Sequence, residues 1–98
     1  MGKVEAIKVE GLELLFYSHD PHMPPHFHAI RESEWNIRIY FLECTESHLE
    51  YDFKFKWLPR LEEIPKNYRK KLLQAVLDKR VELLEEYERK NADHNNKN

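Results

Sequence analysis

LEYDFKFKW, at residues 49–57, is the stretch that decides the fold, because apolar and charged residues alternate along it without a break. Side chains of a β-strand point alternately to opposite faces, so this pattern predicts a strand with one buried and one solvated face. Residues 34–41, EWNIRIYF, alternate in the same way, and a polar stretch around 43–48 joins the two runs. We therefore expect an antiparallel hairpin with one aromatic face in the core. The core faces should carry Trp35, Ile37, Ile39 and Phe41 in one strand and Leu49, Tyr51, Phe53, Phe55 and Trp57 in the other, with Glu50, Asp52, Lys54 and Lys56 in solvent.

Shorter apolar runs precede this hairpin. Residues 4–9 predict a first strand, and Glu10 with Gly11 predicts a turn after it. Residues 12–17 predict a second strand, which is nearly apolar on both faces and should therefore be central in the sheet. Residues 26–30 predict a further short strand, which follows a rigid segment rich in histidine and proline.

From Lys66 to about Lys90 the apolar period becomes helical, and Pro65 suits the first helical turn. The apolar residues form two adjacent stripes that together cover about half of the circumference or more, against the ~100° of an ordinary surface helix. One sheet face cannot cover so wide an arc, so we expect either a break that folds the helix back or a contact with a partner. The first stripe consists of Tyr68, Leu72, Val76, Leu83 and Tyr87, and the second of Leu73, Leu77, Val81 and Leu84.

Grouped strands followed by a helix predict an α+β fold, with an antiparallel sheet of four to five strands packed against a C-terminal helix. A chain of 98 residues suits one domain, which we place at residues 1–90. Residues 91–98 are polar, and we expect them to form a disordered tail.

Composition excludes several classes of protein. The formal net charge of −2 gives no overall field that would attract nucleic acid, and two glycines are too few for a glycine-rich phosphate-binding loop. The single cysteine, Cys44, cannot form an internal disulfide, and we treat it as incidental. No apolar run reaches transmembrane length and no secretory leader is seen, so we expect a soluble cytoplasmic protein.

Four of the six histidines fall within ten residues, around a double proline. In an extended chain His26 and His28 point to the same face, His22 could join them as a third ligand, and Asp20 offers an oxygen. Three imidazoles and a water make up an open zinc site, although imidazole also suits nickel, copper and iron. The alternative is that His26 and His28 are ordinary strand residues whose ring nitrogens bond to backbone carbonyls.

One of these histidines could instead act as a general acid or base without a metal, as in a metal-free ribonuclease. Such an enzyme needs cations near the scissile phosphate, and Arg31 and Arg38 are the candidates beside His26 and His28. The alternative is that both arginines are solvated surface charges.

A basic cluster, KNYRKK at residues 66–71, lies at the expected start of the helix. Cations there oppose the helix dipole. The cluster could bind phosphate groups, including those of nucleic acid, or an acidic partner. The alternative is a solvated helix face with acidic residues such as Asp78 one turn further on.

The segments LFYS at 15–18 and HMPPHFHA at 22–29, with Asp20 between them, resemble the signature of a small prokaryotic family named domain of unknown function 4160. Its members share a strand, an Asp/His-x-Pro-Pro-His-x-His box, another strand and a helix ending in a Glu-Leu-Leu-like stretch, matched here by residues 82–85. The resemblance covers about Ile7 to Tyr87. In this chain Pro21 separates the aspartate from the box, and the strand at 49–57 is longer and more aromatic than in many members.

This resemblance implies no established activity, but genes of the family often lie beside another small family, in arrangements like those of toxin–antitoxin pairs. Three hypotheses follow. The first is a binding or regulatory protein, one component of a two-gene module, that pairs through its helix with itself or with a small protein partner. The second is a metal-binding protein or metal-dependent hydrolase that uses His22, His26 and His28. The third is a metal-free ribonuclease-like toxin.

Overall fold

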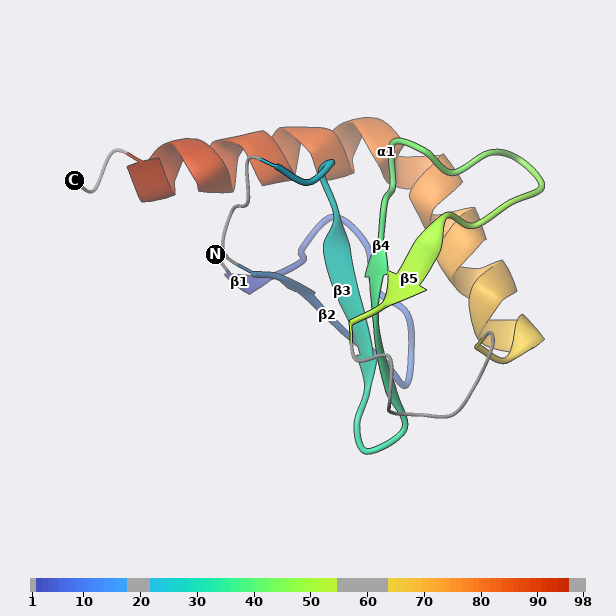
Figure 1. Cartoon of the computed structure of the whole chain (residues 1–98). Coiled ribbons are helices and arrows are strands. Elements are labelled where there is room, and N and C mark those ends of the chain that lie inside the picture. The colour runs from blue at the N-terminus through green and yellow to red at the C-terminus, as the bar shows by residue number, and fades with distance from the viewer. Residues whose placement is uncertain (1, 18–21, 55–63, 96–98) are drawn as a thin grey trace.

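The computed structural model describes residues 2–17, 22–54 and 64–95, with the side chains of these residues up to 91. Five antiparallel strands form one sheet, in which the spatial order follows the chain order, and a long helix packs on one face of it (Figure 1). The expected α+β fold is therefore confirmed. The elements are β1 (Gly2–Lys3), β2 (Glu13–Phe16), β3 (Phe27–Arg31), β4 (Trp35–Ile39), β5 (Tyr51–Phe53) and α1 (Lys66–Asn95).

The core lies between the sheet and α1. In β4 the side chains of Trp35, Ile37 and Ile39 are buried, while the residues between them are only partly covered. Phe27 and Ala29 of β3 are buried on the same face, because Ala29 pairs with Ile37 and Phe27 with Ile39 across the ladder. Period-two alternation therefore decides which face of the hairpin meets the helix, as the sequence predicted.

Pairing of β4 with β5 confirms the expected register within the described residues. Ile37 lies opposite Phe53 and Arg38 lies opposite Asp52, so that apolar and polar residues occupy separate faces. Tyr51 and Phe53 are partly buried and pack against the core, and Leu49 is buried. The polar residues of the run, Glu50, Asp52 and Lys54, stay outside the core, whereas the predictions for Phe55, Lys56 and Trp57 fall outside the described residues.

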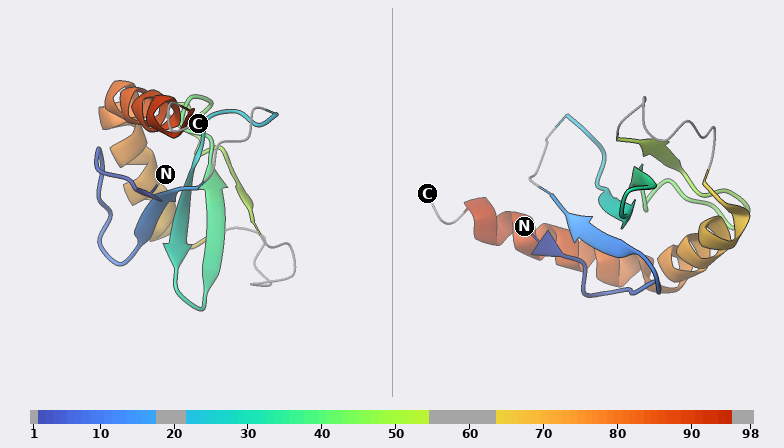
Figure 2. Two further views of the ribbon diagram at one scale, coloured as in Figure 1. Left: turned by 90° about the vertical axis from the view of Figure 1, so that its left-hand side faces the viewer. Right: turned by 90° about the horizontal axis from the view of Figure 1, so that it is seen from below.

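A break in α1 explains the wide apolar arc. Lys79 has φ −128° and ψ 25°, which are not helical values, and the helix bends there into two arms (Figures 1 and 2). Leu72 and Val76 of the first arm are buried, and so are Leu83 and Tyr87 of the second. The break thus lets both arms face the curved sheet, which is one of the two outcomes that the sequence predicted.

The second apolar stripe of α1 is divided by this bend. Leu73 and Leu84 are partly buried and pack against the core, and Leu77 is half-buried. Val81, two residues after the break, is 66% exposed. The excess of apolar surface is therefore smaller than the helical periodicity alone indicates.

The helix continues to Asn95, five residues beyond the end that we expected at Lys90. Residues 96–98 lie outside the described part of the chain, and the division into a domain and a disordered tail stays a prediction. Although α1 has 30 residues, no helix among the described residues combines the length and apolar character that a membrane span requires.

The expected strand at residues 4–9 is wrong. Only Gly2–Lys3 forms a strand, paired with β2, and one further ladder bond joins the amide of Val4 to the carbonyl of Leu14 at 2.9 Å. Beyond it the segment leaves the sheet, although Val4, Ile7 and Val9 are still buried in the core. The apolar spacing therefore predicted correctly that these side chains are buried, but it wrongly predicted that the backbone forms its hydrogen bonds within the sheet.

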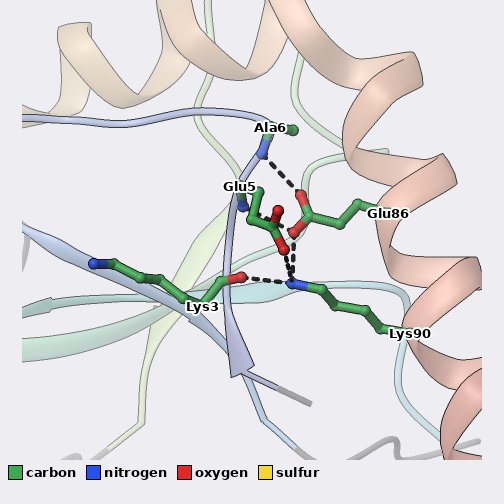
Figure 3. Close-up of polar contacts among 5 residues, drawn as sticks. All are labelled: Lys3, Glu5, Ala6, Glu86 and Lys90. Atoms are coloured by element: carbon green, nitrogen blue, oxygen red, sulfur yellow. Dashed lines mark hydrogen bonds and ion pairs between the residues drawn. The ribbon is translucent and has the colours of Figure 1, made fainter.

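That partner is the buried carboxylate of Glu86 in α1, as Figure 3 shows. Its two oxygens accept hydrogen bonds from the backbone amides of Glu5 and Ala6, both at 2.8 Å. The ammonium of Lys90 bonds to Glu86 at 2.7 Å and to the carbonyl of Lys3 at 2.6 Å. Burial alone would raise the pKa of Glu86, but these hydrogen bonds outweigh it, and the pKa lies below its ordinary value.

Candidate functional site

Most of the predicted site residues lie on the outer face of the sheet, which is the face turned away from α1. His28 of β3 lies directly opposite Arg38 of β4, and Leu15 of β2 is its neighbour on the other side. The core residues Phe27 and Ala29 flank His28 in sequence and point the opposite way. The alternation that buries the hydrophobic face therefore also places His28 and Arg38 together.

His26 and His28 point to the same side, as predicted. Their ring centroids are 5.3 Å apart, with the rings at 67° to one another. On one side the ring of His28 lies 4.1 Å from that of Tyr17, and on the other the ring of His26 lies 5.6 Å from that of Tyr40. These four side chains, Tyr17, His28, His26 and Tyr40, form a continuous ring row across the outer face.

His28 is the buried member of the ring row, with only 3% of its surface exposed. Burial lowers its pKa from 6.5 to about 4, and the positive charges of Lys54 and Arg38 act in the same direction. Its Nδ1 lies 3.3 Å from Oδ1 of Asn36, which can only accept a hydrogen bond, so Nδ1 carries the proton. At neutral pH the ring of His28 is therefore uncharged, with its proton on Nδ1 and none on Nε2.

His26 is more accessible than His28, being only partly buried. Its Nδ1 donates a hydrogen bond to the carbonyl of Pro24 at 2.9 Å. The double proline fixes the backbone that supplies this carbonyl, so the imidazole is held in one orientation. Because Nδ1 makes this hydrogen bond, Nε2 is the ring nitrogen that could serve as a general base or bind a metal.

Charged groups border the ring row. The ammonium of Lys54 lies 4.2 Å from the ring centroid of Tyr17, within the range of a cation–π contact. The guanidinium of Arg38 pairs with Asp52 at 3.0 Å, and the hydroxyl of Tyr40 donates to the same carboxylate at 3.0 Å. Burial, together with Asp52, raises the pKa of Tyr40, so its phenol stays protonated at neutral pH. Two cations and one anion therefore surround the four rings.

Arg31 is not part of this group. Arg31 lies on the helix side of the sheet, where its guanidinium bonds to Glu34 and to the hydroxyl of Tyr68. His22 is exposed, and in the described part of the chain no three His, Cys, Asp or Glu side chains are grouped so that they could hold a metal ion. His19 and Asp20 lie outside the described residues.

Cys44 is buried and is held in the turn after β4. Its thiol lies 3.5 Å from the carbonyl of Tyr40, and it accepts the amide of Glu50 at 3.4 Å. Burial raises the pKa of this thiol, so it stays protonated at neutral pH. A structural role is consistent with these contacts.

Sequence reasoning did not assign Tyr17, Tyr40, Asp52 or Lys54 to the site. The alternating runs did predict that Arg38, Tyr40, Asp52 and Lys54 face solvent, which was the available signal. Sequence reasoning placed Arg38 beside the histidines, but it did not place Tyr40, Asp52 or Lys54 there. That neighbourhood depends on the register of β3 with β4.

The family model described as Domain of unknown function (DUF4160) matches residues 11–88 of the chain. This range includes the ring row and the charged residues that border it. Neither a curated protein nor a solved structure matches the chain.

Proposed function

Because this chain belongs to the family described as Domain of unknown function (DUF4160), a description that names no activity, we propose its function from the geometry of the outer face. The chain is a small binding protein, and its ring row is the contact surface for an unpaired nucleic-acid strand. The observation that carries this proposal is the row of four rings, 4.1 to 5.6 Å apart between neighbouring centroids, with Lys54 over Tyr17 and with Arg38 bound to the same carboxylate as Tyr40.

Exposed rings on a sheet surface are suited to stack on unpaired bases, whatever the base sequence. Tyr17, His26 and Tyr40 each keep part of their surface accessible, while the buried ring of His28 supports Tyr17 and His26 from within the sheet. An uncharged His28 suits this supporting role, because a buried charge without a partner would destabilise the fold.

Cations beside the rings are suited to contact the phosphates. Lys54 lies over Tyr17, and Arg38 lies opposite His28 in the ladder. Asp52 holds Arg38 in place and lowers the net positive charge of the surface. The formal net charge of the chain is −2, so attraction for the strand must come from this local arrangement.

Fluorescence anisotropy with a labelled single-stranded RNA tests the proposal. Tyr17→Leu should weaken binding roughly tenfold, because a stacked base contributes about 1–3 kcal/mol. Lys54→Gln should weaken binding and reduce its salt dependence, because one phosphate contact is lost. The matched control is Lys8→Gln, which removes an exposed cation from the N-terminal segment and should leave binding unchanged. The assignment of the ring row would be refuted if Lys8→Gln weakened binding as much as Lys54→Gln, or if the protein bound duplex RNA as tightly as single-stranded RNA.

A ribonuclease-like activity is a second candidate, favoured by the orientation of His26. Its Nδ1 is engaged by the carbonyl of Pro24, so Nε2 is the candidate base, and Arg38 is the candidate phosphate contact. Incubating the same RNA with the protein in the presence of a chelator tests this role. His26→Gln should remove any cleavage, while it weakens binding no more than Tyr17→Leu does, because each variant removes one stacking ring. Growth arrest on expression, abolished by His26→Gln, would support a place in a toxin–antitoxin-like module.

Metal binding by His26 and His28 is a third candidate. Each ring has Nδ1 engaged by an oxygen, the arrangement in which the other nitrogen serves as a metal ligand. Zinc titration by calorimetry tests it, with His26→Gln and His48→Gln as the matched pair. Zinc binding that persists in His26→Gln, or that disappears in His48→Gln, would contradict a metal site on the ring row.

A further inference from the structure

We propose that a second surface, on the helix side of the sheet and separate from the ring row, binds a phosphate monoester. It is a cavity of about 280 Å³ between residues 47–51 and the first two turns of α1. Three cations, Lys66, Arg69 and Lys70, line it from the helix, and Ser47 and His48 line it from the loop. We call these five residues and the space between them the basic pocket.

The three cations lie on one side of the helix because they are spaced three and four residues apart. Like charges at this spacing, next to a helix N-terminus whose dipole is also positive, destabilise the free helix. The first turn of α1 contains no acidic residue that would compensate. A bound anion would offset the repulsion between these cations, which gives the cluster a role besides helix stability.

The pocket is held in shape by hydrogen bonds on both walls. The amide of Ile64 donates to the hydroxyl of Tyr51 at 3.1 Å, and Nε of Arg69 donates to the carbonyl of Ile64 at 3.0 Å. On the loop wall, Thr45 and His48 exchange two backbone hydrogen bonds, at 2.9 and 3.3 Å. The guanidinium and the loop are therefore positioned before any ligand binds.

The chemistry of the lining favours a phosphate that carries an apolar group. Ser47 can donate one hydrogen bond, and the cations supply charge-assisted ones. Leu49 and Leu73 add apolar surface in the same cavity. Among the described lining residues none is acidic, and Glu50, whose carboxylate lies 3.5 Å from Nε2 of His48, is outside the lining. The phosphate could be that of a free small ester or the terminal phosphate of a nucleic-acid strand.

Amide NMR titration of the full chain with phenyl phosphate, at constant ionic strength and about pH 7.5, tests the proposal. Saturable shifts are expected at residues 47–51 and 66–70. Lys66→Gln and Lys70→Gln should each weaken binding by roughly three- to tenfold, since each removes one charge-assisted hydrogen bond. Lys71→Gln is the matched control, because Lys71 is an exposed neighbour on the same helix that does not line the pocket. All three residues are exposed, and unchanged urea midpoints would show that the variants fold.

Two further ligands complete the test. Benzoate replaces the phosphate by a carboxylate, and it should bind more weakly than phenyl phosphate. A 5′-phosphorylated oligonucleotide, compared with its 5′-hydroxyl form, separates the two sources of phosphate. Tighter binding of the phosphorylated strand indicates that the ligand is a strand end. Binding of phenyl phosphate with no preference between the two oligonucleotides indicates a small ester. The proposal is overturned if Lys71→Gln weakens binding as much as Lys70→Gln, if benzoate binds equally well, or if the shifts do not saturate. Tyr17→Leu should leave phenyl phosphate binding unchanged, so this result is independent of the ring row.

Discussion

Ala6 donates its backbone amide to the carboxylate of Glu86 at 2.8 Å, across 80 positions of the chain. The same carboxylate accepts the amide of Glu5, so one side chain of α1 satisfies two consecutive backbone donors of the N-terminal segment. Glu86 is 3% exposed, and the ammonium of Lys90 balances its charge. This clamp fixes the N-terminal segment against the second arm of the helix (Figure 3).

Glu86→Gln should lower the free energy of unfolding by about 3 kcal/mol, measured by urea denaturation at neutral pH. An amide has one acceptor oxygen, so one backbone donor would face an NH₂ group, and Lys90 would lose its counter-ion. Because the pKa of Glu86 is lowered in the folded state, its contribution is present at neutral pH and is lost as the pH falls through that lowered pKa. Glu85→Gln, at an exposed neighbouring position, should change stability by less than about 0.5 kcal/mol.

His28 should make the protein less stable as the pH falls from about 6.5 to about 4. In this interval the unfolded chain protonates the ring and the folded chain does not, so unfolding takes up a proton and becomes more favourable. Between about pH 7 and pH 5 the loss should be about 1–2 kcal/mol, allowing for solvent screening. Urea midpoints of His28→Gln should depend less on pH than those of the wild type, whereas exposed His48, changed to Gln, should leave the dependence intact. Identical pH profiles for His28→Gln and the wild type would contradict the buried neutral state.

Gly11→Ala should destabilise the fold by about 1–2 kcal/mol in thermal or urea denaturation. Gly11 has φ +87°, and an added Cβ would lie 3.2 Å from the hydroxyl of Tyr68 and 3.3 Å from a guanidinium nitrogen of Arg31. Gly2→Ala is the comparison, because Gly2 also has a positive φ of +138° but no heavy atom within 4 Å of the added Cβ. If Gly11→Ala lowers stability more than Gly2→Ala, the difference measures the cost of bringing the added Cβ close to Tyr68 and Arg31. Equal losses of stability would attribute the effect to backbone strain alone.

Association through α1 stays a proposal, and the bend restricts it to a small surface. Val81 is the most exposed large hydrophobic residue among those described. If the second stripe forms a contact between two copies, light scattering should give the mass of a dimer, and Val81→Lys should return it to that of a monomer. Leu77→Ala, at a half-buried position of the same stripe, should have a smaller effect on the mass. A monomeric wild type at high concentration would remove this proposal for self-association.

Within the candidate site, the sequence predicted some of the geometry and missed the rest. The shared direction of His26 and His28 follows from period two in an extended chain, and it was predictable from residues two apart. That His28 lies opposite Arg38, whereas Arg31 lies on the other face, depends on strand register and parity. Tyr17 joins the row from the residue that follows β2, and no local pattern could indicate that.

Local sequence determined the α+β class, the alternating faces of the β4–β5 pair and the helical C-terminal region, because each depends on a periodicity read along one segment. Tertiary structure alone decided where the N-terminal segment finds its hydrogen bonds. Residues 4–9 have the apolar spacing of a strand, but Glu86 lies far along the chain and offers a carboxylate that competes with the sheet for their amides. Tertiary structure also decided that α1 bends at Lys79 and so buries its wide apolar arc. The direction that each arm of the helix must face is set by the curved sheet, which the sequence of the helix does not show. Burial can be read from one segment, whereas the partner that satisfies a buried backbone group depends on what the rest of the chain brings beside it.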